Sequence, residues 1–362
     1  MADDRRTSGQ PPVDRRVDRL AAYSWRLLVI AAAVIAALYL LKLLSPVVIP
    51  VVIAVFLTRL LSPISDRLRG RLRPGFAAGI AMVVLLGGVA GLSWLIVPPI
   101  ADEAATLGDT VTTAVDDVED WLVNESPWKV SREAVDRFRE RLGNTLGDLV
   151  RSSGSQVVDG ATLVAEMIAG LFLALLFTFF LLRDGARFAT WAQGRLPARQ
   201  RGRAAPAAER GWFVLGRYLR GAAILGVVES IAIGLGLWLA GGSLVGPVMI
   251  LTFLAAFVPI LGAIVAGIVA VLVALVTGGV TTAVIVGIVA LVVQQLDNDL
   301  LAPWIYGRAF ALHPMVILVS VVAGGALFGI AGTLLAVPVV AVTVNVFREL
   351  RGTEASTASR SG

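Results

Sequence analysis

The chain has 362 residues, of which 57% are hydrophobic and 16% charged, and its formal net charge is +5. This composition excludes an ordinary soluble domain, in which about a quarter of the residues are charged. The apolar runs are about 20 residues or longer and apolar on every face, as spanning helices require, whereas a transmembrane barrel shows short alternating segments. We therefore predict an all-α polytopic protein whose first partner is the lipid bilayer.

The residue inventory narrows the chemistry further. There is no cysteine, which excludes disulfides, thiolate metal sites and a cysteine nucleophile. The only histidine, His313, lies between Leu312 and Pro314, so it indicates a loop boundary and cannot form a multi-histidine metal site. Neither a Gly-x-Ser-x-Gly elbow nor a phosphate-binding Gly-Lys-Ser/Thr loop occurs. We predict that the protein is not an enzyme and has no catalytic residue, metal or cofactor.

Arginines beside the apolar runs explain the positive charge by the positive-inside rule, so we predict no nucleic-acid partner. The first two spans are predicted at residues 27–44 and 47–61. Residues 1–22 and 351–362 are predicted to be disordered cytoplasmic ends, the first because it mixes both charges with proline and glycine. The loop after the second span is placed in the cytoplasm because arginines crowd it: Arg59, Arg67, Arg69, Arg71 and Arg73.

A third span, residues 75–97, is predicted to end at Pro98-Pro99, because proline removes a helical hydrogen bond; residues 23–100 thus hold three spans. Residues 101–157 contain twelve Asp or Glu against six Lys or Arg, with apolar residues at helical spacing. We predict an extracytoplasmic insert of amphipathic helices there. Such helices pack on each other, on the membrane surface or on a neighbouring subunit.

Residues 158–350 are predicted to form a transmembrane transport core. Span four, residues 160–182, precedes an arginine-rich segment at residues 183–217, which we interpret as a cytoplasmic loop. Span five, residues 222–240, contains Glu229 about two turns from its start. A carboxylate at that depth is either functional or reaches the headgroups.

A long uncharged stretch follows. Residues 230–296 contain no Asp, Glu, Lys or Arg, and within them residues 246–277 form one apolar block that is interrupted at Pro259 and Gly262. Each half is about 20 Å long, which is too short for a hydrocarbon core of about 30 Å. We therefore predict a re-entrant helical hairpin.

The block at residues 315–347 has nearly the same length and is interrupted near Gly329 and Gly332, so it is predicted to be a second hairpin. With a span at residues 281–301 between them, the chain has about six full spans and two broken or re-entrant hairpins, and both termini are cytoplasmic. Hairpins that enter from opposite faces build midplane sites in transporters. Two continuous helices with glycine or proline kinks are the alternative.

Polar side chains gather where the apolar run ends. Helical spacing places Gln294, Asp297 and Asn298 on one face. Backbone groups freed at the two interruptions add further donors and acceptors without a charged side chain. These groups suit a small polar solute, Na⁺ or a proton; the alternative is that the aspartates cap the span and pair with Arg308. The predicted substrate or ion path comprises Glu229, Pro259, Gly262, Gln294, Gln295, Asp297, Asn298, Asp299, Gly329 and Gly332.

Several short motifs, taken in order, resemble the AI-2E family of membrane transporters. They are Phe-Phe-Leu-Leu-Arg-Asp-Gly at residues 179–185, Val-Pro-Ile-Leu-Gly-Ala at 258–263, Gln-Leu-Asp-Asn-Asp-Leu-Leu-Ala-Pro at 295–303, Leu-His-Pro at 312–314 and Leu-Phe-Gly-Ile-Ala-Gly at 327–332. The chain departs from the family pattern at Ala222, where glutamine often follows the glycine.

The resemblance implies a multi-pass protein of the bacterial cytoplasmic membrane. Some members of the family are assigned to export of the signal autoinducer-2 and others to Na⁺(Li⁺)/H⁺ antiport. Three hypotheses therefore stay open: a secondary exporter of a small polar solute, a monovalent cation/proton antiporter, and a non-transporting scaffold or pore. Small residues four apart, such as Gly226 and Ser230, are compatible with a homo-oligomer and equally with internal packing.

Overall fold

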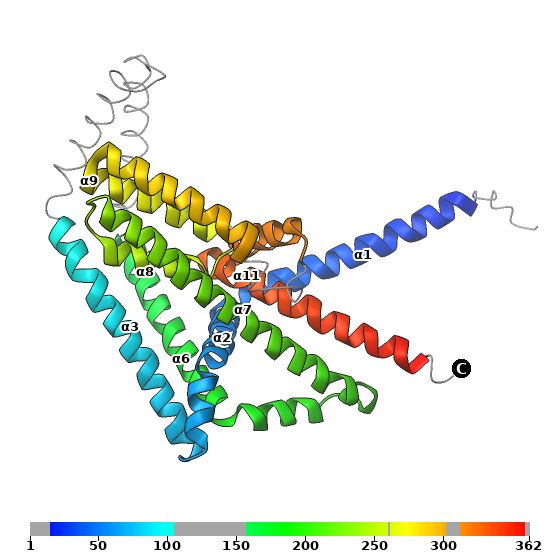
Figure 1. Cartoon of the computed structure of the whole chain (residues 1–362). Coiled ribbons are helices and arrows are strands. Elements are labelled where there is room, and N and C mark those ends of the chain that lie inside the picture. The colour runs from blue at the N-terminus through cyan, green and yellow to red at the C-terminus, as the bar shows by residue number, and fades with distance from the viewer. Residues whose placement is uncertain (1–14, 105–156, 260, 302–311, 359–362) are drawn as a thin grey trace, which may run out of the picture. The chain divides into compact units, whose positions relative to one another are not determined.

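A computed structural model describes residues 15–104, 157–259, 261–301 and 312–358 (Figure 1). All regular elements in these ranges are helices, and seven stretches are long and apolar enough to cross a membrane by length and composition. The predicted all-α polytopic fold is therefore confirmed. Most of the predicted insert at 101–157 and the proposed partner Arg308 lie outside the described residues.

The chain divides into two units, residues 1–48 and 49–362. The first contains α1 (Arg15–Leu43), and none of the residues in its apolar window is buried. A helix that exposes apolar side chains all round is suited to lipid rather than to water. α1 begins inside the segment 1–22 that was predicted to be disordered, because its arginine, leucine and alanine residues are good helix formers.

Three helices extend farther than the sequence analysis predicted. α2 (Ser45–Arg69) includes Arg59 and two further arginines that were assigned to a loop. α3 (Pro74–Ala104) continues through Pro98 and Pro99, which lie in its last two turns, where few later residues depend on the lost hydrogen bond. α6 (Val157–Gly194) extends beyond the predicted end of span four. In these three helices the transition from apolar to charged residues therefore does not end the helix.

The segment 183–217, which was predicted to be a loop, is helical for most of its length. α6 continues to Gly194, a short turn follows, and α7 (Ala198–Leu239) begins at Ala198. Residues 198–210 are rich in alanine and arginine, both of which favour a helix. The cytoplasmic location of this segment stays a prediction.

The interruption at Pro259 produces a helical hairpin. α8 (Val245–Ala255) ends four residues before Pro259, and α9 (Leu261–Leu296) begins after a turn. A Cβ placed on Gly262 would overlap the carbonyl oxygen of Ala255, so the chain folds back tightly. At the other end, the Ser243 N–H donates to Thr277 Oγ1 at 3.1 Å, which places the two arms side by side. We call α8 and residues 261–278 hairpin 1.

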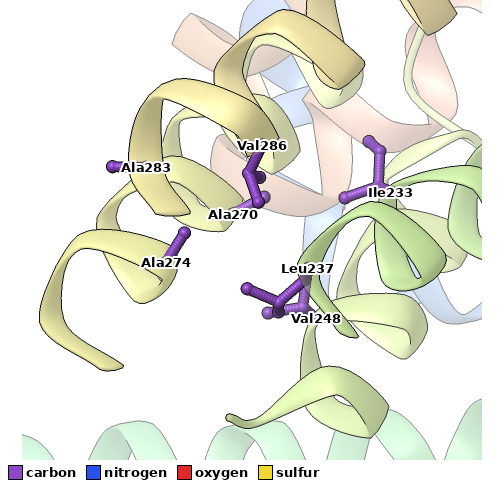
Figure 2. Packing of buried hydrophobic residues seen from close by; sticks show 7 residues of the cluster. All are labelled: Ile233, Leu237, Val248, Ala270, Ala274, Ala283 and Val286. Carbon is purple, nitrogen blue, oxygen red and sulfur yellow. The ribbon is translucent and has the colours of Figure 1, made fainter. Parts of the chain in front are cut away.

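α9 itself bends at Gly279, whose φ of 78° is readily adopted only by glycine. A Cβ on Gly267 would lie 4.0 Å from the Ala290 Cβ, and one on Gly287 would lie 3.6 Å from Val271 Cγ2, so residues 261–278 and 280–296 are antiparallel. Figure 2 shows side chains of both arms meeting in one apolar cluster. The second arm continues into a π-helical turn, η2 (Asp297–Leu301).

α11 (Pro314–Ala358) forms hairpin 2 by bending at Gly329, whose φ is 61°. Gly324 and Gly332 approach so closely that a Cβ on Gly332 would overlap the Gly324 carbonyl oxygen. The first arm, residues 314–328, is about 22 Å long and too short to span the bilayer alone. Both predicted interruptions are confirmed as hairpin turns, while their depth in the membrane stays a prediction. The second arm also extends past residue 351, through most of the predicted disordered tail.

α7 is the helix against which both hairpins pack. Half of its most apolar window is buried, against 28% or less in the other candidate spans. Its C-terminal half meets hairpin 1 through Ile233 and Leu237 (Figure 2). Its N-terminal half meets both arms of hairpin 2 in a second cluster, which contains Leu215, Tyr218, Leu219, Val321 and Val337.

Candidate functional site

Glu229 is a buried carboxylate on α7, with 7% of its surface exposed. Van der Waals contacts of the neighbouring glycines hold hairpin 1 against this part of α7. A Cβ on Gly226 would lie 2.8 Å from the Phe253 carbonyl oxygen, and one on Gly234 would overlap the Met249 side chain. The absence of these side chains therefore lets α8 approach the helix surface on which Glu229 lies.

The register between α7 and the second arm of α9 brings Glu229 to Asp297. Thr282 Oγ1 donates to the Ala240 carbonyl at 2.9 Å, and a Cβ on Gly236 would lie 3.0 Å from Val289 Cγ1. The two helices therefore run antiparallel. Continued toward the start of α7, this register places the Glu229 and Asp297 carboxyl groups within reach of a side-chain hydrogen bond.

This pair requires a proton to form its hydrogen bond. Carboxylates only accept hydrogen bonds, so one of the two groups has to be protonated before it can donate to the other. Asp297 Oδ1 is buried and has no hydrogen-bond partner among the described residues. The arrangement can therefore hold a proton between two acids, or a cation in its place.

A small cavity of about 20 Å³ adjoins Glu229, which is enough for about one water molecule. Thr252 of α8 and Gln294 of α9 supply the other polar side chains in its wall. Thr252 Oγ1 donates to the Val248 carbonyl at 2.8 Å, which leaves its lone pairs as acceptors. The remaining lining residues are apolar: Ile233, Ala263, Ala266, Gly267, Ala290 and Val293.

The predicted cluster after the apolar run divides between two faces. Gln294 lines the cavity and Asp297 reaches Glu229, whereas Gln295 and Asp299 are exposed and hydrogen-bonded to each other. The π-helical turn η2 begins at Asp297, and π-turns are frequent at functional sites. The Asn298 side chain lies outside the described residues.

The backbone groups freed at the hairpin 1 turn are partly taken by the protein itself. Tyr218 of α7 donates its hydroxyl to the Phe257 carbonyl at 2.6 Å, and the Gly262 N–H donates to the Val258 carbonyl at 2.8 Å. The sequence analysis expected the backbone groups near Pro259 to be available to a solute. The Phe257 carbonyl and the Gly262 N–H are instead bonded within the protein.

The other predicted glycines lie in hairpin 2. The Gly329 carbonyl accepts from Thr333 Oγ1 at 3.2 Å, and Gly332 packs on Gly324. Neither residue lines the cavity beside Glu229. The structure thus brings together Glu229, Gln294 and Asp297 from the predicted path, and it leaves Gly329 and Gly332 apart from them.

Two residues of this site were missed by the sequence analysis. Thr252 is the only hydroxyl side chain in α8, so its position in an apolar helix was an available signal. Tyr218 gave no comparable signal, because its partner is a backbone carbonyl 39 residues away.

Comparison with known proteins gives a consistent result. A family model described as AI-2E family transporter matches residues 28–352. "Putative transport protein MT0215" of Mycobacterium tuberculosis is 33% identical over 343 residues, which cover 93% of this chain and 92% of that protein. "Putative permease PerM" of Escherichia coli K12 is 28% identical over 277 residues, covering 73% and 75%. "Putative transport protein YueF" of Bacillus subtilis is 28% identical over 233 residues, covering 63% and 60%.

Proposed function

Because this chain belongs to the AI-2E transporter family, we propose that it is a secondary transporter of the cytoplasmic membrane in which Glu229 and Asp297 form the coupling site. The observation that carries this proposal is the meeting of two acids on different helices, one of them buried in a candidate span. Acids inside the membrane are costly and mark ion or proton pathways.

The geometry best supports exchange of a proton for a monovalent cation. With a proton on the pair, the two carboxyls are hydrogen-bonded to each other. Once the proton leaves, the pair carries two negative charges, and Glu229 faces a cavity of one-water size that also presents Thr252 and Gln294 oxygens. Oxygen ligands suit a hard cation, so Na⁺ can replace the proton with part of its hydration shell.

Export of a small polar solute is the second candidate, because some members of the family are assigned to export. A cavity of about 20 Å³ holds no molecule larger than water, so a solute requires α7 and the hairpins to separate. In this version the pair supplies the driving proton, and the solute crosses between α7 and hairpin 1. A non-transporting scaffold is the third hypothesis, and it needs no acid pair.

Purified protein in liposomes with an imposed pH gradient tests the proposal. We expect sodium-dependent collapse of the gradient, with more than about tenfold loss in Glu229→Gln and in Asp297→Asn, since neither variant can exchange the proton. Asp299→Asn is the matched control and retains activity, because Asp299 is exposed and bonded to Gln295.

Each other outcome identifies a rival hypothesis. Solute flux without sodium-dependent collapse indicates the exporter, and activity in neither assay indicates the scaffold. Equal activity of Asp297→Asn and wild type contradicts the coupling site. A cytoplasm-only reporter fused after Arg351 tests the membrane orientation, and a silent reporter contradicts the cytoplasmic C-terminus.

A further inference from the structure

A second polar site lies apart from the acid pair, where α2 ends, α3 begins and α6 leaves its apolar part. A cavity of about 540 Å³ opens there. We call it the arginine pocket, after the residues that line it: Arg69, Pro74, Gly75, Arg183, Asp184, Ala186 and Arg187.

The lining of the pocket contains three arginines and one acidic residue, Asp184, which pairs with two of them. Arg183 Nε donates to Asp184 Oδ2 at 2.6 Å, and an Arg187 terminal nitrogen lies 3.8 Å from Asp184 Oδ1. Asp184 thus holds two arginines from one turn of α6 at the pocket. Each guanidinium has five N–H donors, and most of them are not needed for these contacts.

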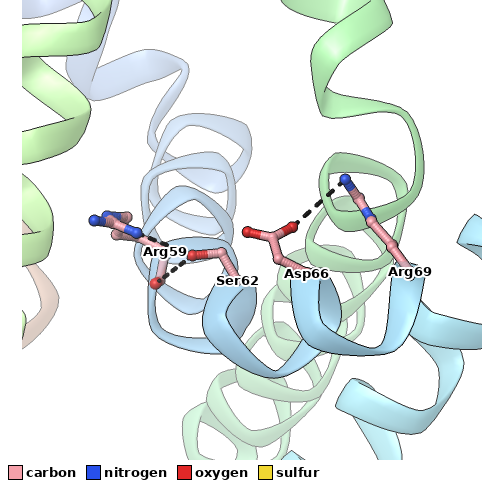
Figure 3. A network of polar contacts seen from close by, with 4 residues as sticks. All are labelled: Arg59, Ser62, Asp66 and Arg69. Carbon is pink, nitrogen blue, oxygen red and sulfur yellow. Dashed lines mark hydrogen bonds and ion pairs between the residues drawn. The ribbon is translucent and has the colours of Figure 1, made fainter. Parts of the chain in front are cut away.

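The third arginine comes from a different helix. Arg69 is held by Asp66, one turn earlier on α2, at 3.6 Å (Figure 3). Guanidinium groups match the paired oxygens of a phosphate, and several of them around one cavity leave an excess of positive charge. Pro74 and Gly75 add the positive end of the α3 dipole, which also favours an anion.

Aromatic residues fix one arginine at the apolar boundary. The Arg183 guanidinium carbon lies 5.0 Å from the Phe180 ring centre and 5.7 Å from that of Phe179. Such cation–π contacts orient the guanidinium plane. A Cβ on Gly75 would lie 3.8 Å from Arg183 Cδ, so the aliphatic part of this arginine forms one wall of the pocket.

Exposed apolar side chains continue from the pocket along the membrane-spanning parts of the same helices. Phe76 directly follows Gly75 and is 68% exposed, and Phe180 precedes Arg183 by one turn and is 44% exposed. Both lie in candidate spans. An anion that fits the pocket and this surface together has a charged head and apolar tails.

A second cavity next to the arginine pocket is less suited to an anion. It shares Arg69 and Ala186 with the arginine pocket, but Asp66 and Glu209 contribute carboxylates to its wall. An anionic head is therefore favoured on the α3 side of Arg69 and disfavoured on the α7 side.

We propose that the arginine pocket binds the phosphate headgroup of an anionic membrane phospholipid, with the acyl chains along Phe76 and Phe180. The site is independent of the acid pair, since it shares no residue with it. Basic pockets between membrane helices are suited to such headgroups.

Native mass spectrometry of the full chain in detergent tests this proposal. We expect phosphatidylglycerol to bind more tightly than zwitterionic phosphatidylcholine. The double variant Arg183→Gln/Arg187→Gln should bind phosphatidylglycerol about tenfold more weakly, since it removes two charge-assisted contacts. Arg69→Gln should lower the affinity for phosphatidylglycerol by a smaller factor, because it removes one arginine and not two.

Arg195→Gln is the matched control. Arg195 also stacks on an aromatic ring, that of Trp191 at 5.1 Å, but it does not line the pocket. Wild-type binding by the double variant, or equal binding of the two lipids, overturns the proposal. Displacement of the lipid by millimolar inorganic phosphate would show a free-phosphate site instead. Circular dichroism and gel filtration verify that each variant is folded, and Arg69→Gln provides the test if the double variant is not.

Discussion

The two helical hairpins share a construction and differ in their chemistry. Each turns at a glycine-containing break, each packs its arms closely through glycine, and each lies against α7. Hairpin 1 faces the buried Glu229 and leads through α9 to Asp297. Hairpin 2 contains no acidic residue between positions 314 and 348, and it meets α7 through apolar side chains.

This difference shows that a broken helix alone does not make a site. The family resemblance and the hairpin geometry apply to both elements, yet of the two only hairpin 1 lines the described cavity beside Glu229, to which it contributes the Thr252 hydroxyl. The functional difference therefore lies in the side chains and not in the hairpin fold. Substitutions in the two hairpins test this difference.

The shared construction predicts equal sensitivity of the two turns to an added methyl group. Gly262→Ala places a Cβ on the Ala255 carbonyl and Gly332→Ala places one on the Gly324 carbonyl. We expect each to lower the free energy of unfolding by about 3 kcal/mol, since backbone has to move. Thermal unfolding in detergent measures the effect.

Gly267→Ala is the control within α9, because its new Cβ would lie 4.0 Å from the nearest atom, the Ala290 Cβ. It should leave the melting temperature nearly unchanged. A melting temperature that falls in only one of Gly262→Ala and Gly332→Ala would show that the hairpins are not built alike.

The turn of hairpin 1 differs from that of hairpin 2 in accepting a hydrogen bond from Tyr218 of α7. Tyr218→Phe leaves the Phe257 carbonyl without its donor, and we expect a loss of about 1–2 kcal/mol of stability. Tyr39→Phe is the control, because Tyr39 is 71% exposed on α1. Equal melting temperatures for the two variants would contradict a structural role for this bond.

Substitution of Thr252 should have the smallest effect, and it tests whether the hydroxyl that lines the cavity contributes to transport. Thr252 and Thr343 make the same bond to a carbonyl four residues earlier, at 2.8 and 2.7 Å, but only Thr252 lines the cavity. Thr252→Val should reduce transport in liposomes about threefold, the equivalent of one membrane hydrogen bond of about 0.6 kcal/mol. Thr343→Val should have no effect, and equal losses would argue against the cavity.

Much of this architecture follows from local sequence. Apolar length identifies the spans, and short half-helices around Pro259 and Gly329 identify the breaks, because a segment of about 20 Å cannot cross the hydrocarbon core. Because charged residues are rare within apolar spans, Glu229 and Asp297 stand out as candidate site residues. Charged segments misled the prediction at residues 183–217, since arginine and alanine continue a helix as well as they begin a loop.

The pairing within the site depends on contacts that sequence spacing does not contain. The approach of Glu229 to Asp297 requires the bend at Gly279 and the register between α7 and the second arm of α9. The separation of Asp297 from Asp299, by contrast, is what helical spacing predicts, since residues two apart lie on opposite faces of a helix. The bend and the register leave no periodic signal in the sequence.

The hydrogen bonds near Ala240 have a mechanical consequence. Thr282 ties α9 to the end of α7, and Thr277 ties the same region to the segment before α8. Both acids lie away from this point: Glu229 is about three turns before Ala240 on α7, and Asp297 directly follows the far end of α9. When two helices are held together at one end, a rotation about that end separates residues more the farther they lie from it. A displacement of α9 from α7 therefore changes the distance between Glu229 and Asp297 more than any distance near Ala240.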